Sequence, residues 1–184
     1  MNTFKNINNQ GATLIELAIY MGLVGFIMVA LVGITVPLLK SSEKNKTETE
    51  LHQNARFVLE KLSQNINQAD PATVSVSLPG DELFLTVKDP ETDAPTPVKF
   101  SVDPSTNIIS FEKPQGNPSP EKLTSAPIKL LKRGGSTPFF QTTDNTANGS
   151  TLKTVMINFE IRYYKGSNLI TSEEYQTTYA LKRI

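Results

Sequence analysis

The apolar residues of this 184-residue chain are spread very unevenly along the sequence. Residues 17–39 carry no charged side chain and are rich in Leu, Ile, Val, Met and Gly. A helix of that length reaches about 34 Å at ~1.5 Å per residue, which exceeds the ~30 Å hydrocarbon core of a bilayer. The pattern therefore predicts a hydrophobic transmembrane helix over residues 12–39.

The residues on either side of this segment predict its orientation. Residues 1–11 form a polar leader in which Lys5 and the amino terminus are the positive charges, so we expect this end to stay in the cytoplasm while the rest is exported. A secretory signal peptide has a shorter apolar stretch and a small-residue cleavage site, whereas this run ends at Val36-Pro37-Leu38. We expect a single-pass protein of the inner (cytoplasmic) membrane.

A second helical pattern follows the hydrophobic segment. Apolar residues recur at helical spacing and form one stripe: Leu51, Ala55, Val58, Leu59, Leu62, Ile66 and Ala69. This pattern predicts an amphipathic continuation of the helix over residues 40–70, ended by Asp70-Pro71. Residues 40–50 lack the stripe and mix Lys with Glu, so both a solvated helix and a frayed linker stay open there.

The remaining residues, 71–184, are typical of a β-rich globular domain. Apolar and polar residues alternate in four segments, 74–78, 83–87, 98–102 and 155–163. Residues 165–168 predict a turn into a last strand near residues 175–181, forming a C-terminal hairpin. We expect loops at residues 89–97, 113–127 and 142–151, which are rich in Pro or polar residues. A sheet resting on the apolar stripe of the helix predicts an α+β fold with a long N-terminal helix packed on an antiparallel β-sheet domain.

Composition removes several classes of function. The chain has 18 Lys and Arg against 18 Asp and Glu, so its formal net charge is zero. Nucleic-acid binding is therefore not predicted from its charge. It has no Cys and a single His, His52, which we interpret as a solvated helix residue. A cysteine nucleophile and a multi-histidine metal site are therefore excluded within one chain. We expect no catalytic residue, no metal site, no cofactor and no enzyme activity.

Two short motifs suggest ligand binding but lack the required spacing. Residues 144–149 resemble the opening of a calcium-binding loop, yet Val155 occupies the position of the acid that closes an EF-hand. Residues 132–135 are basic and glycine-rich without the spacing of a phosphate-binding loop. We interpret the first segment as a surface turn and do not expect the second to bind phosphate.

Glu16 is the unusual residue of the N-terminal segment. It directly precedes the uncharged run, and a charge carried toward the bilayer centre costs about 2.5–3.5 kcal/mol. A helix that serves only as an anchor gains nothing from this carboxylate. Two interpretations remain: an acid that marks the interfacial edge of an anchor, and an acid that serves a task beyond anchoring.

The segment Gly11-Ala12-Thr13-Leu14-Ile15-Glu16 carries a resemblance to a known family. It resembles the N-terminal processing motif of type IV pilins and type II secretion pseudopilins, in which a short polar leader ends in Gly and the following hydrophobic helix has Glu as its fifth residue. Ala12 departs from the Phe of most members. The resemblance implies that a prepilin peptidase cuts between Gly11 and Ala12 on the cytoplasmic side and methylates the new amine of Ala12.

The resemblance also implies a role for Glu16 in filament assembly. In the family the carboxylate pairs with the amine of a neighbouring subunit, while Ala12 and Glu16 are also spaced i, i+4 on one helix. The sequence leaves both pairings open. The implied partners are prepilin peptidase, other pilin or pseudopilin subunits, the membrane and an inner-membrane assembly platform. The implied destination is a filament at the cell surface or in the periplasm.

A second stretch carries a weaker resemblance. Residues 56–69 and 179–183 are similar to segments of J-type minor pseudopilins and PilW-like minor pilins, although major pilins with long stems share the same plan. The sequence thus predicts a structural subunit of a type IV pilus or of a secretion-like pseudopilus, with the choice of major or minor subunit left open. The alternative is a single-pass, membrane-anchored binding or adhesion module that does not polymerise.

Overall fold

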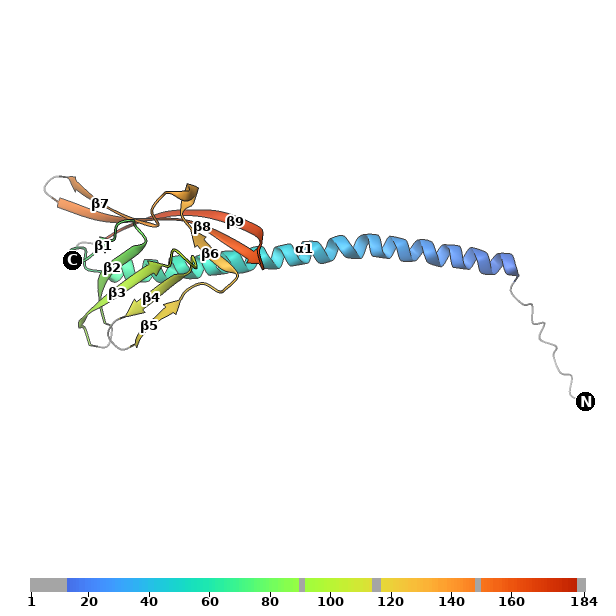
Figure 1. Ribbon diagram of the computed structural model, residues 1–184, viewed down its shortest axis with the longest axis horizontal. Coiled ribbons are helices and arrows are strands. Elements are labelled where there is room, and N and C mark those ends of the chain that lie inside the picture. Colours follow the sequence, from blue (N-terminus) through green and yellow to red (C-terminus); the bar gives the residue numbers. More distant parts are fainter. Residues whose placement is uncertain (1–12, 90–91, 114–116, 148–149, 182–184) are drawn as a thin grey trace, which may run out of the picture. The chain divides into compact units, whose positions relative to one another are not determined.

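In the computed structural model, residues 13–89, 92–113, 117–147 and 150–181 are described. The described elements are one long α-helix, one 3₁₀ turn and nine strands (Figure 1). Their bounds, in chain order, are α1 (Leu14–Gln68), β1 (Ser75–Val76), β2 (Glu82–Lys88), β3 (Pro95–Val102), β4 (Ile109–Lys113), β5 (Asn117–Lys122), β6 (Ile128–Leu131), η1 (Arg133–Gly135), β7 (Phe140–Ala147), β8 (Ser150–Lys165) and β9 (Asn168–Ala180).

The helix α1 contains 55 residues and runs through both predicted helical segments. Its described part begins two residues after Ala12, which lies outside the described residues, and it ends at Gln68, just before Asp70-Pro71. Residues 40–50 are helical, so of the two alternatives for this stretch the structure shows the helix. The helix also continues through Pro37, although proline removes one backbone hydrogen bond there.

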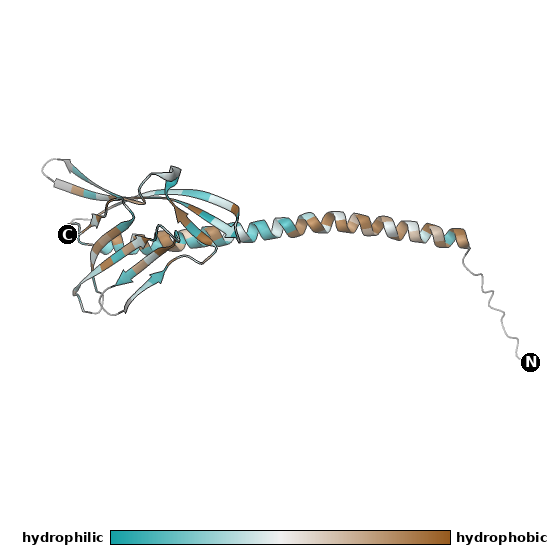
Figure 2. Cartoon of the chain, viewed as in Figure 1, coloured by the Kyte–Doolittle hydropathy of each residue, from teal (hydrophilic) through white to brown (hydrophobic). Residues whose placement is uncertain are grey.

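The chain divides into two compact units after Asn45. The hydrophobic part of α1 belongs to the first unit, while the part from Lys46 onward belongs to the second unit together with all nine described strands. In Figure 2 the first part of α1 is mostly brown, and teal residues appear from the middle of the helix onward. The predicted domain boundaries at residues 11, 39 and 70 stay predictions.

The first sheet consists of five described antiparallel strands in the order β1-β2-β3-β4-β5. The pairing of Phe100 with Phe111 and of Leu83 with Phe100 places large apolar residues on one face. The prediction of a loop over residues 113–127 is wrong in part, because residues 117–122 form β5. Its Pro118 and Pro120 fit a strand because β5 is the sheet's edge, where a missing backbone N–H on the open side breaks no ladder.

The second sheet is built around β8, which pairs antiparallel with β6, β7 and β9. The predicted turn into the last strand is confirmed, since Gly166 and Ser167 connect β8 to β9. The loop expected at residues 142–151 is wrong. Residues 140–147 pair with residues 150–157 as a hairpin, because cross-strand backbone hydrogen bonds hold a polar, threonine-rich segment extended without an apolar face.

Three smaller expectations are also corrected. The first predicted strand, 74–78, is reduced to β1, and Leu78 is fully exposed because the chain turns there toward β2. Residues 95–97, expected to be loop, begin β3 by pairing with the end of β2. Strand β6 was not predicted, because its short segment shows too few alternations to stand out from the Pro-rich residues before it.

The core lies where the outer part of α1 meets both sheets. The stripe residues Leu51, Ala55, Val58, Leu62, Ile66 and Ala69 are all buried, and Leu59 is partly buried, which confirms the predicted stripe. They share one apolar cluster with Phe100 of β3 and Phe159 of β8. The second unit is therefore an α+β assembly in which a helix packs on antiparallel sheets, as predicted.

Gly80 joins the two sheets at a close approach. Its φ of +87° lies in the left-handed region, and a Cβ placed there would come within 2.4 Å of Pro138 Cβ. Gly80 also accepts a hydrogen bond from the backbone N–H of Phe140, with 3.0 Å between N and O. The start of β7 is thereby fixed against the turn between β1 and β2.

Candidate functional site

The hydrophobic part of α1 is the largest exposed apolar surface among the described residues. Every residue from 14 to 46 is exposed, including large side chains such as Phe26, at 76%, and Val29, at 74%. This helix is long and apolar enough to cross a membrane. Monomeric soluble proteins rarely expose such a patch, so these residues require lipid or other protein chains around them.

Glu16 lies in the first turn of α1, at the start of this apolar surface. Its backbone N–H lies 3.4 Å from Thr13 Oγ1, and the helix dipole favours an anion in this turn. Within the described residues, its carboxylate has no hydrogen bond and no ion pair. Gly11 and Ala12 lie outside the described residues, so cleavage between them, methylation of Ala12 and the pairing with Glu16 stay predictions.

The glycines of the hydrophobic segment leave room for close packing. A Cβ added at Gly22, Gly25 or Gly33 would meet no atom within 4 Å in this chain. Their small size is therefore not required by contacts within the described residues. Small residues on an apolar helix permit the backbone of a neighbouring helix to approach closely.

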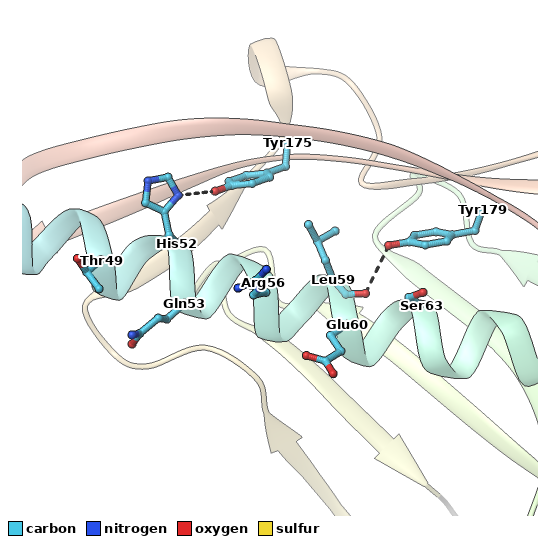
Figure 3. Close-up of a pocket in the computed structure, with 9 residues that line it drawn as sticks. All are labelled: Thr49, His52, Gln53, Arg56, Leu59, Glu60, Ser63, Tyr175 and Tyr179. Carbon is cyan, nitrogen blue, oxygen red and sulfur yellow. Dashed lines mark hydrogen bonds between the residues drawn. The ribbon is translucent and has the colours of Figure 1, made fainter.

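A groove lies between the outer part of α1 and strand β9 (Figure 3). It has a volume of about 740 Å³, and its helix side includes His52, Arg56 and Leu59. Tyr175 and Tyr179 of β9 face the helix across it, and Tyr179 Oη lies 3.5 Å from the backbone oxygen of Leu59. The sequence alternation of β9 predicts one inward face, but only the fold brings that face to this side of α1.

Polar contacts join α1 to β9 beside the groove. His52 Nδ1 lies 3.0 Å from Glu173 Oε2 and 3.1 Å from Tyr175 Oη, and Tyr175 donates a hydrogen bond of 2.8 Å to Glu173. Burial, followed by the contact with the Glu173 carboxylate, raises the pKa of Tyr175, so its phenol stays protonated. His52 is exposed, as predicted, but it also attaches α1 to β9.

Arg56 lies in the same groove and differs from the other charged groups. No hydrogen bond or ion pair joins its guanidinium to any residue in the described ranges, and its side chain is exposed. Arginine offers several planar donors that match a carboxylate. Arg56 is therefore an available cation beside two tyrosines, a combination that sequence periodicity does not reveal.

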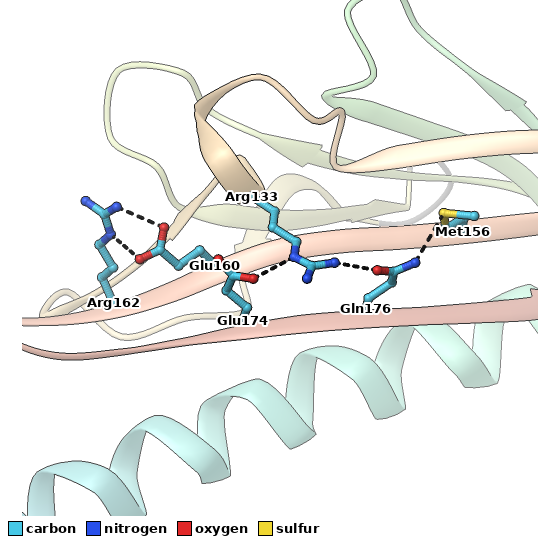
Figure 4. Close-up of polar contacts among 6 residues, drawn as sticks. All are labelled: Arg133, Met156, Glu160, Arg162, Glu174 and Gln176. Atoms are coloured by element: carbon cyan, nitrogen blue, oxygen red, sulfur yellow. Dashed lines mark hydrogen bonds and ion pairs between the residues drawn. The ribbon is translucent and has the colours of Figure 1, made fainter.

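The opposite face of β8 and β9 carries paired charges (Figure 4). Arg133 of η1 donates to Glu174 over 2.6 Å and to Gln176, and Arg162 contacts Glu160 through two bonds of 2.7 and 2.8 Å. The Arg162 guanidinium lowers the pKa of Glu160, while the Glu160 carboxylate raises the pKa of Arg162. Unlike Arg56, Arg133 is therefore engaged by partners within the chain.

The two short motifs that resemble ligand-binding loops, residues 132–135 and 144–149, take part in contacts that hold the fold together. Lys132 pairs with Asp81, with 2.9 Å between Nζ and Oδ1, so residues 132–135 connect the two sheets. The segment 144–149 belongs to the β7–β8 hairpin, whose residues 148 and 149 lie outside the described residues. Among the described residues, no group of three or more His, Asp or Glu side chains is placed to hold a metal ion. The expectations of no metal, no cofactor and no catalysis stay predictions.

Comparisons of this chain with protein families, with curated proteins and with solved structures give no match.

Proposed function

We propose that the chain is a structural subunit of a pilin-like filament, inserted in the inner membrane as a precursor and assembled through α1. The observation that carries this proposal is the fully exposed apolar segment of α1, residues 14–39, with one acid, Glu16, in its first turn. Bilayer lipid provides an apolar environment for the apolar side chains, but it provides no cationic partner for the carboxylate. A bundle of such helices satisfies both, if each carboxylate meets a cation.

The processing step supplies that cation. Cleavage after Gly11 creates an amine on Ala12, and a carboxylate removed from water requires a partner, because an unpaired buried charge is far costlier than a paired one. In this proposal a prepilin peptidase cuts and methylates the chain, and an inner-membrane assembly platform adds it to the fibre. The fibre lies at the cell surface or in the periplasm.

The second unit supports the same proposal. Its apolar core is buried within residues 51–181, and its described surface carries paired charges. Such a unit suits the outer surface of a fibre whose core is formed by the hydrophobic helices. Its antiparallel sheets packed on the helix match the layout that the pilin resemblance implies.

Mass spectrometry of the full chain tests the proposal directly. The chain is produced in cells that carry a prepilin peptidase, and intact masses are measured for the membrane fraction and for sheared fibres. We expect a mature chain that begins at Ala12 and carries one methyl group, whereas cells without the peptidase keep Met1. A fibre fraction that contains intact Met1 or a chain cut after residue 36, or the recovery of monomers alone, would contradict it.

A further inference from the structure

Strand β8 has two sides, and both sides end in a strand with an open edge. Strand β9 pairs with β8 residues 154–165, while β6 and β7 pair with the non-overlapping residues 160–163 and 150–157. Strand β9 therefore occupies one side of β8, and β6 and β7 share the other. Among the described residues no strand pairs with the outer edge of β9 or of β7, although at the start of β7 the N–H of Phe140 donates to Gly80, so the open edge of β7 lies beyond Phe140.

Open edges of this kind need a cover. The unpaired N–H and C=O groups of an edge strand are a template for another strand, and natural proteins protect them. Strand β9 runs for 13 residues without a proline, and the groove that contains Arg56 lies between β9 and α1. A strand added to β9 would place alternate side chains over this groove.

Strand β7 carries a carboxylate on the matching face. Residues paired across two strands share a face, so Thr142 and Asp144 lie on the same face as Val155 and Lys153. Val155 is buried on the side that faces α1, whereas Thr142 and Asp144 are exposed. Within the described residues, Asp144 has no hydrogen bond or ion pair. An available carboxylate on one edge thus matches an available guanidinium beside the other.

We propose that β7 of one copy adds to the outer edge of β9 in the next copy, with Asp144 facing Arg56 in the groove. This contact rests on the proposed function, because it joins copies that lie side by side in one fibre. The contact is heterologous: one edge binds a different edge, so it repeats from copy to copy without closing a dimer.

The strand directions favour this arrangement over a symmetric one. Strands β7 and β9 both run antiparallel to β8, so they run parallel to each other. Joining them keeps all copies in one orientation, with residue 46 of α1 at the same end of every copy. An antiparallel contact between two β9 edges would reverse one copy, which is incompatible with chains inserted in one membrane.

The side-chain contacts of β9 give the register. His52 contacts Tyr175 and the backbone of Leu59 contacts Tyr179. Arg56 comes between His52 and Leu59 on the helix, so we infer that it lies level with the middle of this β9 segment, at Thr177. Asp144 opposite Thr177 places Asn145 of one copy beside Thr178 of the next, on the outer face. Both Asn145 and Thr178 are exposed.

Engineered cysteines test this register, because the natural chain has none. The full chain with Asn145→Cys and Thr178→Cys is assembled in cells and oxidised, and products are separated without reductant. Within one copy the two positions lie about 16 Å apart across β8, at ~4.8 Å per strand and ~3.3 Å per residue, too far for a disulfide. We expect a ladder of dimers, trimers and longer products, while each single variant stays largely monomeric.

A matched pair controls for random collision. Asn145→Cys with Ser172→Cys keeps the same outer face of β9 but moves the second thiol six residues along the strand. We expect the ladder to be on the order of tenfold weaker, because the thiols no longer meet. A ladder of equal strength from both pairs, or dimers from Thr178→Cys alone, would overturn the proposal.

Charge reversal provides an independent measurement in the Cys pair. We expect Arg56→Asp or Asp144→Arg alone to reduce the ladder severalfold, and both together to restore it, since like charges in contact oppose association. If fibres form without any cross-linked ladder, and if neither charge reversal changes the fibre yield, this contact is overturned while the proposed function stands. A natural chain that forms no fibre and keeps Met1 would overturn both.

Discussion

Among single residues, Glu16 carries the strongest functional expectation. It is the one acid in the first turn of α1, and no described residue neutralises it. Its position next to an uncharged segment makes sense if assembly supplies a cation. The carboxylate is then a requirement of the polymer and not of the folded monomer.

Substitution of Glu16 separates these two roles. We expect Glu16→Ala to abolish sheared fibres while the chain still inserts in the membrane, because removing one member of a buried ion pair costs about 3–5 kcal/mol. Fibre yield and membrane content are measured by immunoblotting, with Glu121→Ala, an exposed acid of β5, as the control. Normal fibres from Glu16→Ala would favour the anchored module that does not polymerise.

Asp103 shows how a surface turn fixes a carboxylate. Hydrogen bonds from the Ser105 side chain and backbone, and then from Thr106, lower its pKa from 3.8 to about 2. A lowered pKa in the folded state means that this contribution to stability is present above pH 3.8 and is lost as the pH falls through about 2.

A titration of the Asp103 carboxyl carbon by nuclear magnetic resonance measures this effect. We expect a midpoint near pH 2 in the natural chain and a shift toward 3.8 in Ser105→Ala, which removes the largest cause but keeps the backbone donor. Thr106→Ala should shift it less, because the Thr106 hydroxyl is a smaller cause. Equal midpoints in all three chains would contradict the assignment.

Among the elements, the outer part of α1 holds the two sheets in one core. Its stripe is buried against residues of both sheets, and its flanks contact each one separately: Lys61 Nζ lies 4.8 Å from the ring centroid of Phe111 in β4, and Tyr179 of β9 contacts Leu59. A helix in this position stabilises both sheets at once.

Truncation of the stripe should therefore loosen the whole second unit. Leu62 is fully buried, and Leu62→Ala is expected to lower the free energy of unfolding by about 2–5 kcal/mol through lost burial and a residual cavity. Pulse proteolysis in urea, with the full chain in detergent micelles, measures the midpoint. Gln64→Ala, exposed two residues further on, is the control and should leave the midpoint nearly unchanged.

For the whole molecule, the division after Asn45 separates a unit that exposes its apolar side chains from a unit that buries them. The first unit exposes apolar side chains along its helix, whereas the buried cluster of the second unit lies entirely between Leu51 and Leu181. The two units therefore need different surroundings: the first an apolar one, and the second water.

Removal of the first unit tests this division. We expect residues 46–184 alone to be monomeric in water and to unfold cooperatively, because every residue of the core cluster is retained. Gel filtration and a circular dichroism melt measure these properties, with the full chain in and out of detergent for comparison. Aggregation, or a melt without a cooperative transition, would show that the hydrophobic segment is needed for folding.

Much of the fold could be predicted from local pattern, and the exceptions share one cause. The stripe from Leu51 to Ile66 predicts a buried face because a helix repeats its faces at fixed spacing. The strands over residues 117–122 and 142–147 were missed because Pro and Thr-rich segments lack that signal, and hydrogen bonds to a neighbouring strand hold them extended. Of the candidate site, Glu16 was predicted from its position, but Arg56 and Asp144 were not.

The sequence by itself determined the long apolar helix, the acid at its start, the buried stripe and the turn into the last strand. Each of these depends on residues close together in the chain. Only the tertiary structure decided which strands lie at open edges, that β9 runs beside α1, and that Arg56 has no partner in the described part of the chain. Those features depend on contacts between distant residues, and a one-dimensional pattern does not specify such contacts.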